Sequence, residues 1–193
     1  MQWDARIGVS CGWSWCSWRL PGGGSSGPVL ADDFPPGVRQ LSIQRVSSDR
    51  KYELGIAGLR VEPYIDRKYT IRRLPDRLIA AQMVRTSMDD DYVTTDDHLR
   101  LELPETTEVI VAVDAHGEQR AGWMKQWSLC DETLAVDNIE YRLYRRIVPA
   151  GSLTLGGNDR RRTGARSNYF VLLLPSQETP ETAAPPFPVE QFE

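Results

Sequence analysis

Long hydrophobic runs and histidines are scarce in this 193-residue sequence. The longest apolar stretches, residues 109–113 and 169–174, are strand-sized and far shorter than the roughly 20 residues that a helix needs to cross a bilayer. No membrane-spanning helix is therefore expected. The two histidines, His98 and His116, lie near no serine or cysteine in a pattern typical of a nucleophile with its base, and we expect both at the surface.

An excess of one charge sign is also lacking, because acidic and basic residues are mixed and the net charge is only -4. Proteins that bind nucleic acid normally carry an extended basic face, so nucleic acid is not expected as a partner. The same balance gives no indication of binding to a membrane surface.

Three cysteines are too few for a disulfide scaffold. Cys11 and Cys16 are close enough to form a small disulfide loop, but free thiols are the favoured alternative, and Cys130 lies far away. These thiols and two histidines provide too few soft ligands for a zinc site. Residues 1–20 lack the basic start and continuous apolar stretch of an export signal, although the chain could be a fragment of an exported protein.

Composition divides the chain into three zones. Residues 1–36 hold four of the six tryptophans and a Gly/Pro/Ser run, which predicts an irregular tail or linker. Residues 176–193 are rich in Pro, Glu, Thr and Ala and predict a disordered tail. Residues 37–175 remain for a folded domain, with its strands from about residue 53.

Between the tails, apolar residues recur with the short period of strands, and long helical periodicity is absent. Residues 99–103 alternate apolar and polar, as in a half-buried strand, whereas residues 109–113 are continuously apolar and predict a central strand covered on both sides. Further strands are expected at 52–56, 64–71, 78–84, 140–147, 151–155 and 168–174. The pattern predicts an all-β fold: an antiparallel, jelly-roll-like sandwich with flexible terminal tails.

Candidate ligand-binding groups lie in the connections. Asp89, Asp90 and Asp91 form the densest acidic run and could hold a structural calcium ion, although such runs are more often simply solvated. Residues 160–162 together with Arg166 form a basic loop that could contact an anionic sugar or an acidic neighbouring domain. No other cofactor is expected.

Trp123 and Trp127 are the aromatic residues with the clearest binding potential, because indole faces stack on sugar rings. Tryptophan in a sandwich is also commonly buried, and we expect at least one of the two in the core. Gly156 and Gly157 are expected to permit a tight turn through positive φ angles, and Asn158 to bond its own backbone across that turn.

Several segments resemble a β-sandwich accessory domain that recurs in secreted bacterial polysaccharide-degrading enzymes and related exported proteins. The most specific segment is VPAGSLTLGGN (148–158) followed by SNYFV (167–171). Shorter similarities are YIDRKY (64–69), LPDRL (74–78), IVAVD (110–114) and GWM (122–124). The resemblance implies a non-catalytic module appended to an enzyme, and an extracellular or periplasmic location.

Together, the resemblance and the aromatic residues predict a carbohydrate-binding or accessory module. Its expected sugar contacts are Trp123, Trp127, Tyr64 and Arg67, and its expected partner is a polysaccharide or a neighbouring enzyme domain. Two alternatives remain open: a structural or interaction domain without a sugar ligand, and a polysaccharide lyase or glycoside hydrolase. No paired carboxylates or other catalytic groups are recognisable from their spacing, so catalysis is not expected.

Overall fold

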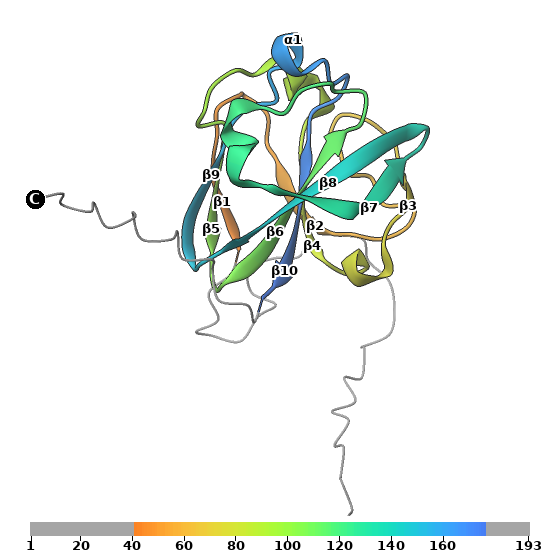
Figure 1. The fold of residues 1–193 in the computed structure, drawn as a ribbon. Coiled ribbons are helices and arrows are strands. Elements are labelled where there is room, and N and C mark those ends of the chain that lie inside the picture. Colours follow the sequence, from red (N-terminus) through yellow and green to blue (C-terminus); the bar gives the residue numbers. More distant parts are fainter. Residues whose placement is uncertain (1–40, 177–193) are drawn as a thin grey trace, which may run out of the picture. The chain divides into compact units, whose positions relative to one another are not determined.

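A computed structural model describes residues 41–176 of the chain (Figure 1). The predicted tails, residues 1–36 and 176–193, lie outside the described residues except for residue 176, as do Cys11 and Cys16. No helix among the described residues is long and apolar enough to span a bilayer. Their one cysteine, Cys130, is a partly buried free thiol.

Ten strands and four short helices make up the domain. The strands are β1 (Ser42–Val46), β2 (Glu53–Ile56), β3 (Ile71–Arg73), β4 (Gln82–Arg85), β5 (Leu99–Leu103), β6 (Thr107–Asp114), β7 (Ser128–Val136), β8 (Ile139–Val148), β9 (Gly151–Leu155) and β10 (Phe170–Pro175). The helices are the single α-helical turn α1 (Arg160–Thr163) and the 3-10 helices η2 (Asp76–Leu78), η3 (Met88–Tyr92) and η4 (Gly122–Gln126).

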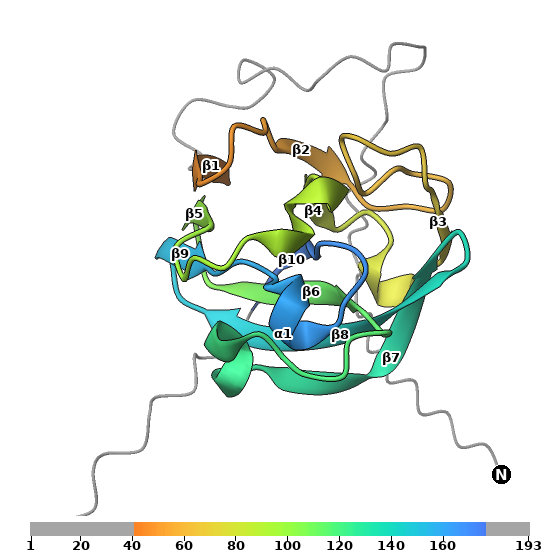
Figure 2. The ribbon, with the colours of Figure 1, turned by 90° about the horizontal axis from the view of Figure 1, so that it is seen from above.

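The strands form two antiparallel sheets that face each other. One has three strands in the order β1-β5-β9, and the other has seven in the order β2-β4-β10-β6-β8-β7-β3. Figure 2 shows that the larger sheet is strongly curled. The predicted all-β antiparallel sandwich is therefore confirmed.

The seven-stranded sheet is buried on both faces, and strand β6 shows why. Its residues Val109 and Val111 join the core between the two sheets, where Leu101 and Leu153 oppose them. The alternate residues Ile110 and Ala112 point to the concave side of the curled sheet, into a second core. The predicted central strand covered on both sides is confirmed, because its uninterrupted apolar run supplies both cores.

The second core is completed by the connection from β2 to β4, residues 57–81, which crosses the concave side. Tyr64, Leu74 and Leu78 from this connection are buried beside Phe170 of β10. Of the strand expected at 64–71, only Ile71 belongs to a sheet strand, the first residue of β3, and Tyr64 forms an isolated bridge to Thr86. The remainder of that prediction is wrong, because the segment packs across the sheet and pairs with it only at this single bridge. The expected strand at 78–84 likewise begins only at Gln82, after η2.

Candidate functional site

A polar hollow of about 430 Å³ lies where three connections meet at one end of the sandwich. The connections are the segment before β3, the 3-10 helix η3, and the segment from α1 to β10. Its volume falls within the range of about 300–1,000 Å³ that is usual for ligand pockets. The lining residues are Arg67, Tyr69, Met88, Asp89, Asp91, Tyr92, Arg160 and Arg166.

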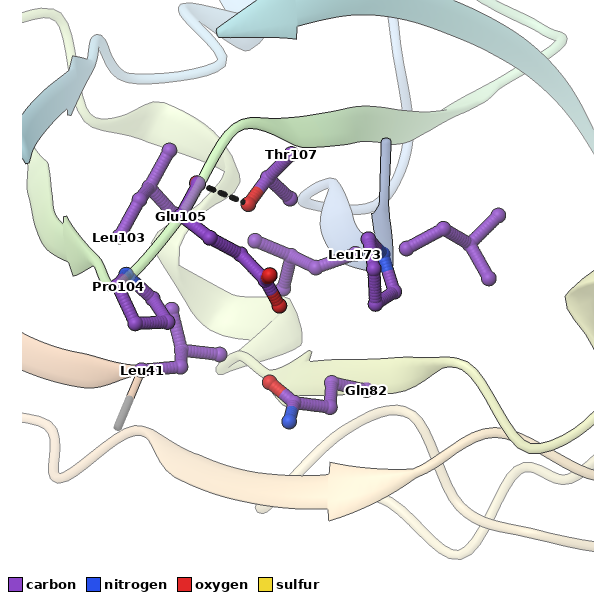
Figure 3. A pocket seen from close by; sticks show the side chains of 9 residues that line it. Leu41, Gln82, Leu103, Pro104, Glu105, Thr107 and Leu173 are labelled. Atoms are coloured by element: carbon purple, nitrogen blue, oxygen red, sulfur yellow. Dashed lines mark hydrogen bonds between the residues drawn. The ribbon is translucent and has the colours of Figure 1, made fainter. Parts of the chain in front are cut away.

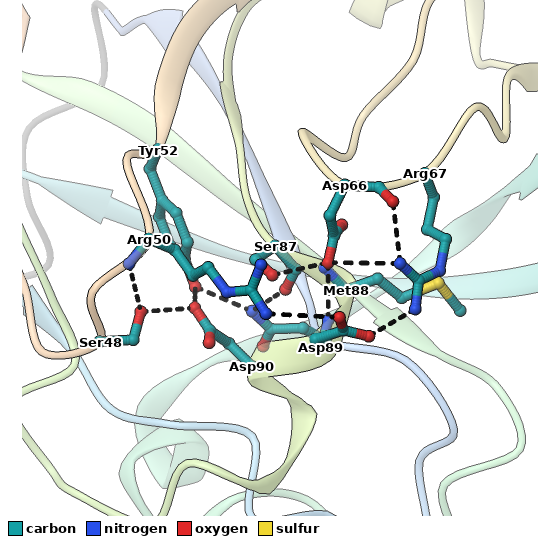
Figure 4. A network of polar contacts seen from close by, with 10 residues as sticks. Ser48, Arg50, Tyr52, Asp66, Arg67, Ser87, Met88, Asp89 and Asp90 are labelled. Atoms are coloured by element: carbon teal, nitrogen blue, oxygen red, sulfur yellow. Dashed lines mark hydrogen bonds and ion pairs between the residues drawn. The ribbon is translucent and has the colours of Figure 1, made fainter.

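Asp66 joins two of these connections by capping the start of η3 (Figure 4). Its carboxylate accepts hydrogen bonds from the backbone N–H groups of Met88 (2.8 Å) and Asp89 (3.1 Å) and from Ser87 Oγ (2.7 Å). Burial raises the pKa of Asp66, but these donors outweigh it and hold the pKa below its usual value. The charged carboxylate therefore fixes the position of η3 relative to Arg67.

Arg67 is the one predicted sugar-contact residue that lines the hollow. Its guanidinium donates to the backbone carbonyl of Asp66 (2.8 Å) and to the carboxylate of Asp89, which Arg50 also approaches at 3.5 Å. The Arg67 side chain remains 39% exposed, so the ion pair contributes about 0–1 kcal/mol to stability. The Arg67 guanidinium can therefore exchange a hydrogen bond to Asp89 for one to a ligand with little loss of stability.

Arg160 and Tyr92 form the opposite side of the hollow. Arg160 Nη1 donates to Asp91 Oδ2 (2.8 Å), and its guanidinium carbon lies 5.0 Å from the centroid of the Tyr92 ring. Tyr92 is nevertheless 54% exposed as a residue. Burial raises the pKa of Asp91, although Arg160 opposes the shift. One face of Tyr92 is thus held by a cation–π contact while much of the ring meets solvent.

Behind the hollow, Asp90 turns inward into a buried polar network (Figure 4). Ser48 Oγ and Tyr52 Oη each donate to Asp90 Oδ2 at 2.7 Å. The Asn168 amide donates to Tyr52 Oη (3.1 Å) and to the Ser87 carbonyl (3.0 Å). Burial and the neighbouring Asp90 hold the pKa of Tyr52 far above its usual value, so the phenol stays protonated as a donor.

His98 belongs to this network, and its predicted surface position is wrong because the side chain is fully buried. Nε2 lies 2.7 Å from Tyr52 Oη, and Nδ1 lies 2.8 Å from Ser47 Oγ. Since Tyr52 donates to Asp90, its oxygen accepts a hydrogen bond from His98 Nε2–H, and His98 Nδ1 accepts a hydrogen bond from Ser47 Oγ. Burial lowers the pKa of His98, and Asp90 opposes this only in part. His116 is 45% exposed, as expected.

Asp89, Asp90 and Asp91 do not converge as the calcium hypothesis requires. Asp89 pairs with arginines, Asp90 points into the buried network, and Asp91 pairs with Arg160. Within residues 41–176, no three acidic, histidine or cysteine side chains are placed to share a metal ion. Successive residues of this single 3-10 turn point in different directions, so the run is not arranged as a calcium site. The favoured alternative of a simply solvated run is wrong for Asp90 and Asp91, which are buried.

The predicted aromatic sugar platform does not form. Tyr64 is fully buried and donates to the carbonyl of Asn168 (2.6 Å), and Trp127 is only 3% exposed. Trp123 is half-buried, and its indole N–H donates to the Gly157 carbonyl (3.0 Å). The alternative of core packing therefore holds for Trp127, and Tyr64 cannot stack on a sugar because no face of its ring reaches solvent.

Gly156 and Gly157 are required by close packing, which corrects the expected role of positive φ. A Cβ on Gly156 would lie 2.4 Å from Trp123 Cδ1, and one on Gly157 would lie 2.1 Å from the Val93 carbonyl oxygen. Positive-φ glycines among the described residues are Gly151 and Gly164. Asn158 does not bond its own turn: its buried amide donates to the Ser167 carbonyl (3.1 Å) and joins two segments.

A second, smaller pocket lies at the other end of the sandwich, near the start of β6 (Figure 3). Its volume of about 40 Å³ has room for a few water molecules but not for a sugar. Thr107 Oγ1, which lines it, already donates to the Glu105 carbonyl (2.8 Å). This pocket is therefore no candidate for the ligand site.

Tyr69 and Tyr92 were not predicted as site residues. Tyr69 lies within YIDRKY, and Tyr92 directly follows the acidic run. Neither residue belongs to a regular apolar–polar alternation, so the sequence does not indicate whether it is exposed. The predicted basic loop, residues 160–162 with Arg166, does contribute two residues to the hollow, Arg160 and Arg166. The structure places Arg160 and Arg166 beside Arg67, which the sequence could not show.

Comparison with protein-family models and with curated proteins returns no match. Among solved structures, the fold is similar to part of a β-glucuronidase from glycoside hydrolase family 2, with a TM-score of 0.63 and 19% sequence identity. The match covers 72% of this chain and 14% of that enzyme's chain. The similarity shows a shared β-sandwich fold, and this chain corresponds to a small part of the larger enzyme.

Proposed function

We propose that the domain is a non-catalytic carbohydrate-binding accessory module and that the polar hollow is its sugar site. The observation that carries this proposal is the distribution of the tyrosines. All seven lie within the described residues; five are buried, and the two exposed ones, Tyr69 (38%) and Tyr92 (54%), both line the hollow. Aromatic faces beside charged hydrogen-bonding groups are the chemistry by which proteins hold sugar rings.

The surroundings of the two tyrosines support the proposal. Arg67, Arg160 and Asp89 line the same hollow and are partly exposed, so they can exchange hydrogen bonds with hydroxyl groups. The likeness to one part of a glycoside hydrolase provides further support, because it places this fold within an enzyme that processes sugars. As an accessory module, the domain would bring a polysaccharide to a neighbouring enzyme domain.

Affinity electrophoresis of the full chain through gels containing a panel of plant and algal polysaccharides tests the proposal. At least one polymer should retard the protein, and Tyr69→Ala and Tyr92→Ala should each weaken binding about tenfold, or about 1.4 kcal/mol. Leu129→Ala is the matched control, because Leu129 is 55% exposed on β7 and does not line the hollow. Release of reducing ends or unsaturated products would contradict the non-catalytic assignment.

A structural or interaction domain is the second candidate, favoured by the edge strand β2. Leu54 and Ile56 are 47% and 52% exposed on this strand, and Leu59 just beyond it is 57% exposed. An apolar sheet edge of this kind can pack against a neighbouring domain. Folded protein that passes every polysaccharide gel without retardation would favour this candidate over the sugar site.

A further inference from the structure

The charges in the hollow are unevenly paired. Three arginines, Arg67, Arg160 and Arg166, line it together with two carboxylates, Asp89 and Asp91. Asp91 accepts from Arg160, and Asp89 from Arg67. Among these lining residues, one arginine therefore has no carboxylate partner, although Asp66 adds a negative charge just outside the lining, 3.8 Å from Arg67 Nη1.

The unpaired charge belongs to Arg166. Its side chain is exposed and has no hydrogen-bond or ion-pair partner within residues 41–176. Its backbone, in contrast, is held firmly, because its N–H donates to the buried Asp114 carboxylate (2.9 Å). The neighbouring residues Ala165 and Ser167 are fully buried, and Ser167 Oγ also donates to Asp114 (3.1 Å).

A guanidinium that extends from a fixed backbone into a hollow is suited to one kind of ligand group. Its planar donors match the paired oxygens of a carboxylate or sulfate, with two parallel hydrogen bonds. A neutral hydroxyl gains less from the same donors, because charge-assisted hydrogen bonds are about twice as strong. Arg166 therefore distinguishes an acidic sugar from a neutral one.

From this arrangement we infer that the hollow is selective for anionic sugars, a specificity that rests on the proposed sugar-binding function. Arg166 binds the carboxylate or sulfate of the sugar, and Tyr69 and Tyr92 contact its ring. Arg67 and Arg160 remain paired with their aspartates and bind hydroxyl groups. The selectivity is local, since the negative net charge of the chain repels an anionic polymer at long range.

The experiment compares polymers that differ only in charge, with the full chain in affinity gels. Polygalacturonate and its methyl ester differ in the carboxylate, and dextran sulfate and dextran differ in the sulfate. The wild-type protein should bind one charged polymer at least about tenfold more tightly than its neutral counterpart, and the pair that responds identifies the anionic group. Arg166→Gln should remove most of that difference.

Arg146→Gln is the matched control, because it removes the same charge. Arg146 is exposed on β8, opposite Val109, and does not line the hollow. If the two variants weaken binding equally, or if the wild-type protein binds charged and neutral polymers alike, the anionic selectivity is wrong while the sugar site stands. If no polymer in this set or the wider panel binds the folded protein, the proposed function itself fails.

Discussion

Gly156→Ala should destabilise the domain through one side chain, that of Trp123. The new Cβ would lie 2.4 Å from Trp123 Cδ1 and 2.9 Å from Cγ, closer than Cβ atoms pack, so the indole must move. Overpacking of this kind costs about 1–3 kcal/mol. Displacement also breaks the hydrogen bond from the Trp123 indole to the Gly157 carbonyl, worth about 1 kcal/mol. The expected loss in free energy of unfolding is about 2–4 kcal/mol.

A double-mutant cycle isolates this mechanism. In a Trp123→Ala background the obstructing ring is absent, and alanine at position 156 should cost less than about 0.5 kcal/mol, because its backbone has no positive φ. Gly157→Ala is the contrasting control: its Cβ would lie 2.1 Å from the Val93 carbonyl oxygen, which is backbone and cannot rotate away. Its cost should therefore persist in the Trp123→Ala background.

The measurement is urea unfolding of the single and double variants, followed by far-UV circular dichroism because removal of Trp123 would alter the tryptophan fluorescence. The coupling energy between positions 156 and 123 should be about 2–4 kcal/mol. That between 157 and 123 should not exceed about 1 kcal/mol, the worth of the indole hydrogen bond to the Gly157 carbonyl. A cost for Gly156→Ala that is unchanged when Trp123 is removed would refute the steric explanation. So would a single variant as stable as the wild-type protein.

Two further predictions concern the polar groups behind the hollow. Because folded His98 has a lowered pKa, the unfolded chain takes up its proton first as pH falls below the usual value of about 6.5. The free energy of unfolding should therefore decrease from pH 7 to pH 5 in urea titrations, and His98→Gln should show a smaller decrease; equal slopes would contradict the neutral buried state. Asp66→Ala should lower stability by about 1–3 kcal/mol through loss of the η3 cap. It should also weaken polysaccharide binding in affinity gels more than Arg146→Gln does, and unchanged binding would refute its role in positioning η3.

The strands that could be predicted are those whose sequence reports their burial directly. Residues 99–103 alternate in β5 as expected, and the apolar run at 109–113 forms the middle of β6. The predicted strand at 151–155 is β9, and that at 140–147 is β8 with one residue more at each end. In these segments hydrophobic periodicity and local propensity agree, so no tertiary information was needed.

Two strands were missed because their burial is uneven. Strand β7 contains the polar stretch CDET, and a register shift interrupts its pairing with β8 between Leu129 and Thr133. Strand β1 has no fully buried residue. Tyr64 was assigned to a strand and to a sugar contact, but its hydroxyl is satisfied by Asn168, over a hundred positions away. Such long-range partners leave no local pattern.

The hollow could be predicted only in fragments for the same reason. Arg67 and the basic loop with Arg166 were identified as separate candidates, and the sequence contains no sign that folding joins them. The tyrosines were indistinguishable from the five buried ones, since tyrosine is common in both environments. Tyr69 and Tyr92 are exposed because their connections run outside the two cores, and the path of a connection depends on the whole fold.

The segment most specific in sequence, LGGN, acts on the hollow indirectly. The Gly157 N–H donates to the Thr95 carbonyl (2.7 Å), and the Asp159 N–H donates to the Val93 carbonyl (2.9 Å). These bonds tie the chain just after Tyr92 to the chain just before Arg160. Gly157→Ala disturbs this junction and should weaken polysaccharide binding by the folded protein. Gly156→Ala displaces Trp123 and its hydrogen bond to the Gly157 carbonyl but leaves these two backbone bonds in place. It should leave the affinity of the folded fraction within about twofold; equal losses in both variants would show that the junction does not position the site.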